Sequence, residues 1–163
     1  MDQQAFIQLI QPFQSKLFRV AKRLLLSQEE AEDATQEVLV RLWTKKQELP
    51  RYQSVEALAV TMTKNYCLDQ LKAKRSQHLR VDEVKLTGSA SNLEREIEAR
   101  DQLRQVEQCI DSLPEQQRLI LQLREIEQME FEEIAQQLNM NETAIRVALS
   151  RARKALREKL IQR

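Results

Sequence analysis

The 163-residue chain carries 26 Lys or Arg against 25 Asp or Glu, a formal net charge of +1, with 42% hydrophobic residues, one glycine and three prolines. This composition is that of a soluble globular protein and excludes a molecule that is basic throughout. Its many helix-forming residues predict an all-α protein of one or two small domains. No apolar run approaches a membrane span and the N-terminus lacks a basic leader, so we expect a cytoplasmic protein.

Residues with the chemistry of catalysis or metal binding are sparse. Cys67 and Cys109 are far apart and lack the Cys/His spacing of a zinc site, and His78 is the single histidine. We expect reduced, packed or idle thiols, no metal, no cofactor and no catalytic residues. Because the sequence also lacks a Gly-rich phosphate loop, an enzyme is a distant alternative.

The N-terminal part of the chain predicts two amphipathic helices. Apolar residues recur at helical spacing from Phe6 to Leu25, with Pro12 as a kink or within an early break. Ser27 and Glu30 then form a capping-box pattern that starts a second helix reaching about residue 46. Off its apolar stripe this second helix carries carboxylate and amide side chains, for which ordinary solvated surface is the simplest interpretation.

A third predicted helix completes the N-terminal half. It starts after Ser54, which has the N-cap pattern, and ends in the basic run 72–75. Such a run is a solvated helix end as often as a binding surface. The stretch that follows is polar and aperiodic and contains the single glycine. We therefore predict a domain at 1–76, a linker at 77–92 and a domain at 93–163.

The second half opens with two further predicted helices in an acidic stretch. A helical period runs from Leu93 to Ile110, and Ser112 with Glu115 forms a second capping box that places Pro114 in a first turn. Between 106 and 133 eight acidic residues stand against two basic ones. This stretch should not lie against DNA, because the phosphate backbone repels negative charge.

The segment from Phe131 to Arg157 predicts a helix-turn-helix. Apolar residues at i, i+3, i+4 and i+7 mark a short helix that begins at Phe131, with Ala135 as the small residue where a second helix crosses. Asn139 interrupts the period, and Asn141 can cap a longer helix. Residues 134–163 hold seven basic and two acidic residues. A basic helix alone is often only a solvated helix end, but the turn and the crossing point favour DNA binding.

Two separated stretches resemble the domains of one protein family. Residues 31–43 (AEDATQEVLVRLW) and 65–72 (NYCLDQLK) resemble the region-2 domain of bacterial sigma factors of the extracytoplasmic-function type. Residues 113–115 (LPE), 131–135 (FEEIA) and 151–153 (RAR) resemble their region-4 domain. The resemblance covers nearly the full chain, in the family's order and spacing. It implies a two-domain helical sigma factor that brings core RNA polymerase to promoters and opens the −10 element.

The resemblance also implies three binding surfaces. Docking on the clamp helices of the polymerase's largest subunit falls on Asp33, Gln36, Glu37, Leu39 and Val40. Contacts with the −10 element fall on a base-pocketing loop and a polar helix face: Arg51, Tyr52, Gln53, Ser54, Lys64, Asn65, Lys72, Lys74 and Arg75. Contacts with the −35 element fall on the second helix of the helix-turn-helix: Thr143, Arg146, Val147, Ser150, Arg151 and Lys154.

The sequence departs from the family at several positions. Asn139 and Glu127-Gln128 replace frequent glycines, and Ala57-Leu58 replaces an aromatic residue that many members carry, which implies a factor that demands a good promoter. We expect no extra domain, no small-molecule substrate, no membrane insertion and control by an anti-sigma factor. The main alternative is a helix-turn-helix regulator whose first half is a sensing or dimerisation bundle.

Overall fold

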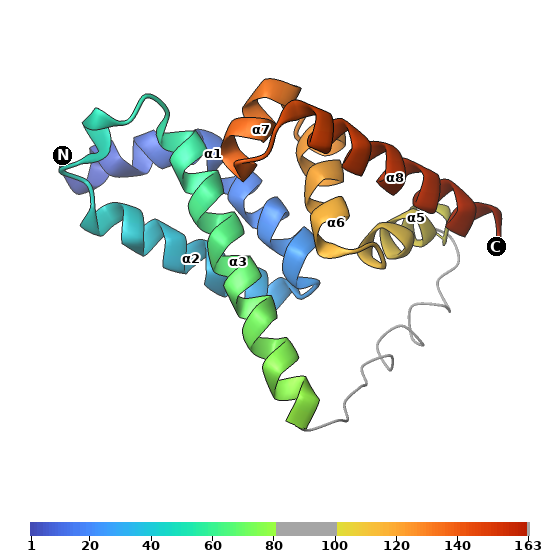
Figure 1. Ribbon diagram of the computed structural model, residues 1–163. Coiled ribbons are helices and arrows are strands. Elements are labelled where there is room, and N and C mark those ends of the chain that lie inside the picture. Colours follow the sequence, from blue (N-terminus) through green and yellow to red (C-terminus); the bar gives the residue numbers. More distant parts are fainter. Residues whose placement is uncertain (81–100, 163) are drawn as a thin grey trace.

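The computed structural model describes residues 1–80 and 101–162, and within these ranges the chain is helical without a strand (Figure 1). The N-terminal domain consists of α1 (Gln3–Leu25), α2 (Gln28–Thr44), the 3₁₀ turn η1 (Leu49–Arg51) and α3 (Val55–Arg80). The C-terminal domain consists of α5 (Asp101–Asp111), α6 (Glu115–Leu121), the π-helical turn η3 (Gln122–Ile126), α7 (Phe131–Leu138) and α8 (Glu142–Ile161). The predicted all-α class is confirmed.

Helix α1 is the centre of the N-terminal domain and packs against both α2 and α3 (Figure 1). It runs through Pro12 without a break, and its stripe from Leu17 to Leu24 is buried. Two threonines lie in the same core, where their hydroxyls donate to main-chain carbonyls: Thr35 to Ala31 at 2.8 Å and Thr63 to Ala59 at 2.9 Å. These bonds satisfy the buried hydroxyls without a side-chain partner.

The helix boundaries follow local capping. Ser27 Oγ accepts the Glu30 N–H at 3.2 Å, and Ser54 Oγ accepts the Ala57 N–H at 3.0 Å, as the sequence predicts. Helix α3 continues through Arg80, so residues 77–80 of the predicted linker are helical. Residues 81–92 of that linker, and residues 93–100 of the helix predicted from Leu93, lie outside the described ranges.

The start of α6 differs from the prediction. The Ser112 hydroxyl does not cap this helix but donates to the Cys109 carbonyl at 2.7 Å, at the end of α5. Helix α6 starts one residue after Pro114, whose fixed φ leads the chain into the first turn. It then widens into η3, where the Glu127 N–H donates to the Gln122 carbonyl five residues back, at 2.9 Å.

Within the described ranges 1–80 and 101–162, three residues with a Cβ adopt the left-handed conformation. They are Leu26, which ends α1, Gln128, which precedes α7, and Asn139, which ends α7, with φ of 62°, 58° and 56°. Gln128 and Asn139 lie at positions where the sigma factors that the sequence resembles often have glycine. The turns of that family are therefore kept here at a conformational cost of about 1–2 kcal/mol per residue, less for asparagine.

The two domains pack against each other in the structure. Helix α1 contacts α6 and η3, and α3 contacts α7, so the buried apolar cluster runs from one domain into the other. Asp33 belongs to the predicted polymerase surface and Arg146 to the predicted −35 surface, and both side chains are exposed in this arrangement. The packing therefore leaves the outer surfaces of both domains accessible.

Candidate nucleic-acid and protein interfaces

Helices α7 and α8 form the predicted helix-turn-helix. Ile134 of α7 packs into the buried cluster with Ile145 and Leu149 of α8. The turn is closed by the Met140 N–H, which donates to a carbonyl of α7 at 3.0 Å, and by the Asn141 side chain, which accepts the Ala144 N–H at 2.7 Å. These contacts fix where α8 begins and which of its faces points outward.

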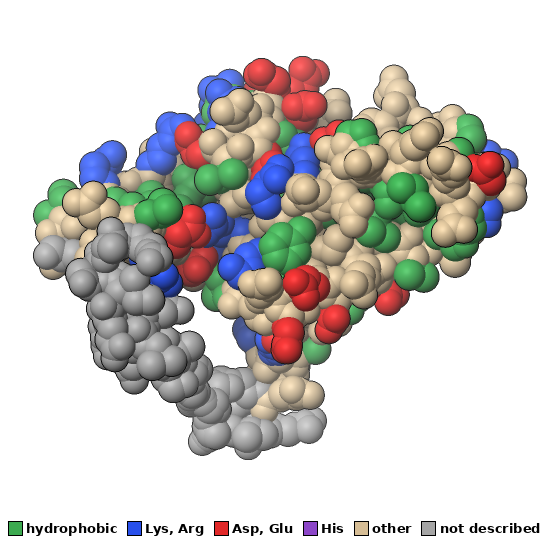
Figure 2. Space-filling model, turned by 180° about the vertical axis from the view of Figure 1, so that it is seen from behind, with side chains coloured by type: hydrophobic (Ala, Val, Ile, Leu, Met, Phe, Trp, Pro, Cys, Tyr) green, Lys and Arg blue, Asp and Glu red, His purple; other side chains and the backbone are tan. Residues whose placement is uncertain are grey.

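The outer face of α8 is polar, basic and exposed. Its inner face is buried through Ile145, Ala148, Leu149 and Ala152, so the helical period turns the remaining residues to solvent. All six side chains predicted for the −35 element are exposed: Thr143, Arg146, Val147, Ser150, Arg151 and Lys154. In Figure 2 Lys and Arg side chains gather at the end of the molecule where α8 lies. Hydroxyls, forked guanidiniums and one apolar side chain suit base edges and phosphates.

Two arginines of α8 are held by neighbouring side chains. Arg153 forms an ion pair with Glu125 of η3, with its Nε 3.0 Å from the carboxylate. Arg146 lies 3.6 Å from the Glu142 carboxylate, and its Cζ lies 4.0 Å from the centroid of the Phe131 ring. From its helical spacing Phe131 is predicted to be a core residue only. Its place at the first position of a short helix is the signal that its ring can also reach the edge of the core.

The loop predicted to hold a −10 base lies beside the C-terminal domain. Residues 51–54 are exposed, with Tyr52 39% accessible. Tyr52, Gln53 and Ser54 line an open groove of about 500 Å³ whose far wall includes Met129, Glu133, Gln136 and Gln137. The loop therefore faces α7 across this groove, a neighbour that sequence reasoning did not place there.

The basic end of α3 is exposed but partly paired. Lys74 lies 2.6 Å from the Glu30 carboxylate of α2, and Arg75 forms an ion pair with Glu115 of α6 in the other domain. Lys72 and Asn65 are exposed, whereas Lys64 is half-buried, and this burial lowers the pKa of its ammonium group. Exposed pairs of this kind contribute little to stability, so a phosphate can compete for these cations.

The α2 surface predicted for polymerase docking is a contiguous outer strip. Asp33 and Gln36 are exposed, and Val40 is 57% accessible between them and the end of the helix. Glu37 pairs with Arg41 at 2.9 Å. Gln36 and half-buried Leu39 also line a groove of about 460 Å³ between α1 and α2. Carboxylates beside accessible apolar groups suit a partner surface that is basic and partly apolar.

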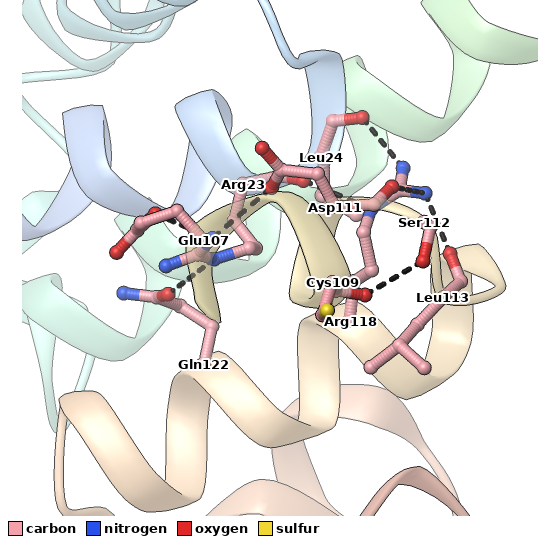
Figure 3. Close-up of polar contacts among 9 residues, drawn as sticks. All are labelled: Arg23, Leu24, Glu107, Cys109, Asp111, Ser112, Leu113, Arg118 and Gln122. Carbon is pink, nitrogen blue, oxygen red and sulfur yellow. Dashed lines mark hydrogen bonds and ion pairs between the residues drawn. The ribbon is translucent and has the colours of Figure 1, made fainter. Parts of the chain in front are cut away.

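The domain interface contains a buried polar contact that sequence reasoning missed. Arg118 of α6 is 6% exposed, and its guanidinium donates to the carbonyls of Arg23 and Leu24 at 3.0 and 2.8 Å and to that of Leu113 at 2.8 Å (Figure 3). Arg118 thus satisfies the free carbonyls at the C-terminus of α1, where the helix dipole favours a cation. Burial lowers the pKa of this guanidinium, with neighbouring acids opposing the shift.

Two arginines of α1 complete this contact. Arg23 donates to Gln122 at 2.8 Å and to Glu107 and Asp111 at 3.1 Å (Figure 3). Arg19 donates twice to the Glu127 carboxylate, at 2.8 and 2.6 Å. Burial favours a higher pKa for Glu127, but hydrogen bonds from Arg19 and Gln122 and nearby positive charge outweigh it and hold that pKa below its ordinary value. We call Arg19, Arg23, Arg118, Gln122 and Glu127 the interdomain seam.

Other chemistry is limited. Within residues 1–80 and 101–162 no group of His, Cys, Asp and Glu is arranged to hold a metal ion, and no helix in these ranges is long and apolar enough to cross a membrane. Both cysteines are free and buried, as expected, and burial raises the pKa of the Cys67 thiol to about 12. At neutral pH this thiol is therefore protonated and unreactive.

Comparison with known proteins gives one consistent result. Residues 9–77 match the family model for Sigma-70 region 2, and residues 103–156 match that for Sigma-70, region 4. The chain is 22% identical to the ECF RNA polymerase sigma factor SigW of Bacillus subtilis, over 98% of this chain and 90% of SigW. It is 28% identical to the ECF RNA polymerase sigma factor SigE of Mycolicibacterium smegmatis, over 94% of this chain and 60% of SigE.

A solved structure has the same fold. The sigma factor RpoE of Bartonella quintana, in complex with the anti-sigma factor NepR, superposes with a TM-score of 0.74 at 22% identity, over 96% of each chain. The two family models and this superposition cover both domains described above, in the same order.

Proposed function

Because this chain belongs to the sigma-70 family, in its extracytoplasmic-function branch, and directs transcription initiation, we propose how its surfaces divide the work between RNA polymerase and promoter DNA. The observation that carries the function is the presence of a region-2 and a region-4 domain in this order in one chain. Sigma factors are not enzymes in themselves. We propose that this chain acts in the cytoplasm and performs no chemistry of its own.

The α2 strip of Asp33, Gln36, Glu37, Leu39 and Val40 is our candidate for docking on the clamp helices of core polymerase. Its support is an exposed carboxylate and amide beside an accessible valine and the α1/α2 groove. Charge complementarity would guide the encounter with a basic coiled coil, and burial of Val40 and Leu39 would slow dissociation.

The loop 51–54 and the polar face of α3 are our candidate for −10 recognition. An exposed tyrosine beside Gln53 and Ser54 offers one stacking surface and several hydrogen-bonding groups to an unstacked base. Lys64, Asn65, Lys72, Lys74 and Arg75 would follow the backbone of the opened strand. Strand opening is then base capture, in which these contacts offset an unstacking cost of a few kcal/mol per base.

The outer face of α8 is our candidate for −35 recognition. Arg146, Val147 and Arg151 would reach base edges in the major groove, and Thr143, Ser150 and Lys154 would contact edges or phosphates. Val147 is 41% exposed, which suits contact with a thymine methyl group. The acidic stretch 106–133 would face away from the duplex.

Simultaneous contact with both elements requires the domains to part. If the two elements are centred about 25 base pairs apart, at about 3.4 Å per base pair, they are separated by about 85 Å along the duplex. Domains in direct contact cannot span this distance. We propose that polymerase binding replaces the interdomain seam, and that an anti-sigma factor, the kind of partner bound to RpoE of Bartonella quintana, acts on the closed chain.

Run-off transcription with purified core polymerase and a library of promoters tests the proposed function. We expect the full chain to form a complex with core polymerase and to start transcription at a subset of promoters with a defined −35 and −10 sequence. A chain that binds a duplex operator as a dimer, without polymerase and without supporting transcription, would instead be a helix-turn-helix regulator.

A further inference from the structure

Two arginine guanidiniums lie over the Phe131 ring. Arg146 Cζ lies 4.0 Å and Arg124 Cζ 4.2 Å from the ring centroid. Both distances are within the range of a cation–π contact, so both guanidiniums interact with the same ring. Each cation also has a carboxylate within reach, Glu142 at 3.6 Å from Arg146 and Glu130 at 3.9 Å from Arg124, which offsets their mutual repulsion.

The ring and Arg124 form a fixed platform. Phe131 is the first residue of α7, and the residue before it closes a capping box in which the Glu130 N–H donates to Glu133 at 3.0 Å. The Arg124 guanidinium is itself held by the main chain, because its Nη1 donates to the Met129 carbonyl at 2.8 Å. Hydrogen bonds that do not involve Arg146 therefore hold the backbone next to the ring and the Arg124 guanidinium.

Arg146 is more exposed than Arg124, whose side chain is 31% exposed. The Arg146 side chain is 58% exposed, and its contacts within residues 1–80 and 101–162 are the Phe131 ring and the exposed Glu142 carboxylate. A free arginine in this position would sample many rotamers and lose that freedom on binding DNA. Stacking uses the face of the guanidinium and leaves its in-plane N–H donors available. Contact with the ring therefore limits the orientations in which Arg146 presents its N–H donors.

We propose that Phe131 is a positioning residue for −35 recognition, which orders the Arg146 guanidinium for contact with a base edge, while Arg124 packs on the same ring and helps to hold it in place. The inference rests on the proposed role of Arg146 in reading the −35 element. It adds that the discrimination depends on an aromatic side chain outside α8 that does not itself touch the base.

The test compares promoter pairs that differ at one −35 base pair, bound by the full chain assembled with core polymerase. The readout is the ratio of affinities within each pair, because this ratio does not depend on how much of a variant is folded. We expect Arg146→Ala to abolish preference at one position. Phe131→Leu should lower preference at that same position about two- to fivefold, the effect of losing one exposed cation–π contact, and leave other positions within experimental error.

Two further variants separate positioning from packing. Phe131→Tyr keeps an aromatic face and should retain the preference, whereas Phe131→Met, a second non-aromatic replacement, should repeat the loss seen with leucine. In the Arg146→Ala background Phe131→Leu should change no ratio, because the group that it positions is absent.

The outcomes distinguish the two claims. If Arg146→Ala leaves every ratio unchanged, the −35 role of Arg146 is wrong and the inference falls with it. If Arg146→Ala acts at one position but Phe131→Leu changes no ratio, or changes ratios equally with and without Arg146, then Arg146 reads DNA without help from Phe131 and only the inference is overturned.

Discussion

The arginines of the interdomain seam and those of the outer face of α8 have the same side chain and opposite surroundings. At the seam Arg118 is buried and three main-chain carbonyls accept its hydrogen bonds within 3.0 Å, whereas Arg151 on α8 is exposed. The N–H donors of Arg118 are bound by carbonyls of the protein, whereas those of Arg151 face water. The first arginine therefore contributes to the folded state, and the second is available to another molecule.

The largest expected effect comes from removing the buried guanidinium. Arg118→Ala leaves the carbonyls of Arg23, Leu24 and Leu113 without their donor and should lower the free energy of unfolding by about 3 kcal/mol. Urea unfolding followed by circular dichroism measures this change. Arg151→Ala is the matched control and should change it by less than about 0.5 kcal/mol. Equal losses for the two variants would remove the distinction between the two groups of arginines.

The polymerase surface should behave like the outer face of α8, with a change in binding and none in folding. Asp33→Arg combined with Gln36→Ala replaces the exposed carboxylate and amide of α2 and should weaken association with core polymerase about tenfold or more, about 1.4 kcal/mol. Glu48→Arg, an equal charge change at an exposed position away from this strip, should have little effect. Unchanged affinity of the double variant in a pull-down titration would rule out this docking surface.

Within the outer face of α8 the two kinds of basic side chain should separate. Arg146→Ala should cost about 1–3 kcal/mol for the preferred base pair at one −35 position, because a base-edge contact is lost. Lys154→Ala should weaken binding to all sequences alike and reduce the salt dependence, because a phosphate contact is lost. Equal losses for both variants across a −35 library, measured at two salt concentrations, would contradict this division.

The smallest expected effect is a dependence of domain packing on pH. The pKa of Glu127 is lower when the two domains are packed together than when they are apart. The contribution of this carboxylate to the stability of domain packing is therefore complete above the ordinary carboxyl pKa of about 4.3, and it is lost as the pH falls through the lowered pKa. Because Arg19 is half exposed, we expect less than about 1 kcal/mol. Small-angle scattering should show expansion at acidic pH, and Glu127→Gln should flatten that response. A pH response unchanged by Glu127→Gln would exclude this carboxyl as its source.

The elements of the fold that follow local rules were predictable from the sequence. Ser27, Ser54 and Asn141 cap the helices that they were expected to cap, and the apolar period of 131–138 gives the limits of α7. The outer face of α8 was predictable for the same reason, since burying Ile145 and Leu149 determines which side chains remain outside. The Ser112 capping box was a wrong prediction, because Pro114 starts the helix later and leaves the hydroxyl to α5.

The contacts between distant segments were not predictable. Nothing in the local sequence around Arg23 or Arg118 indicates that residues 95 positions apart will share hydrogen bonds, since an arginine on an amphipathic helix is usually solvated. The same holds for the Phe131 ring, whose apolar character agrees with a core position but does not reveal two guanidiniums over it. Such contacts depend on how whole helices pack, which no single period encodes.

Site-specific photo-crosslinking from two positions tests the central claim most directly. Gln53→Cys and Ser150→Cys each add one exposed thiol to a chain whose own cysteines are buried, so a crosslinker attaches where intended. In the complex with core polymerase we predict that residue 150 crosslinks to the −35 element and residue 53 to the −10 element of the same promoter. Crosslinks from both positions to one element, or from neither to promoter DNA, would contradict the account.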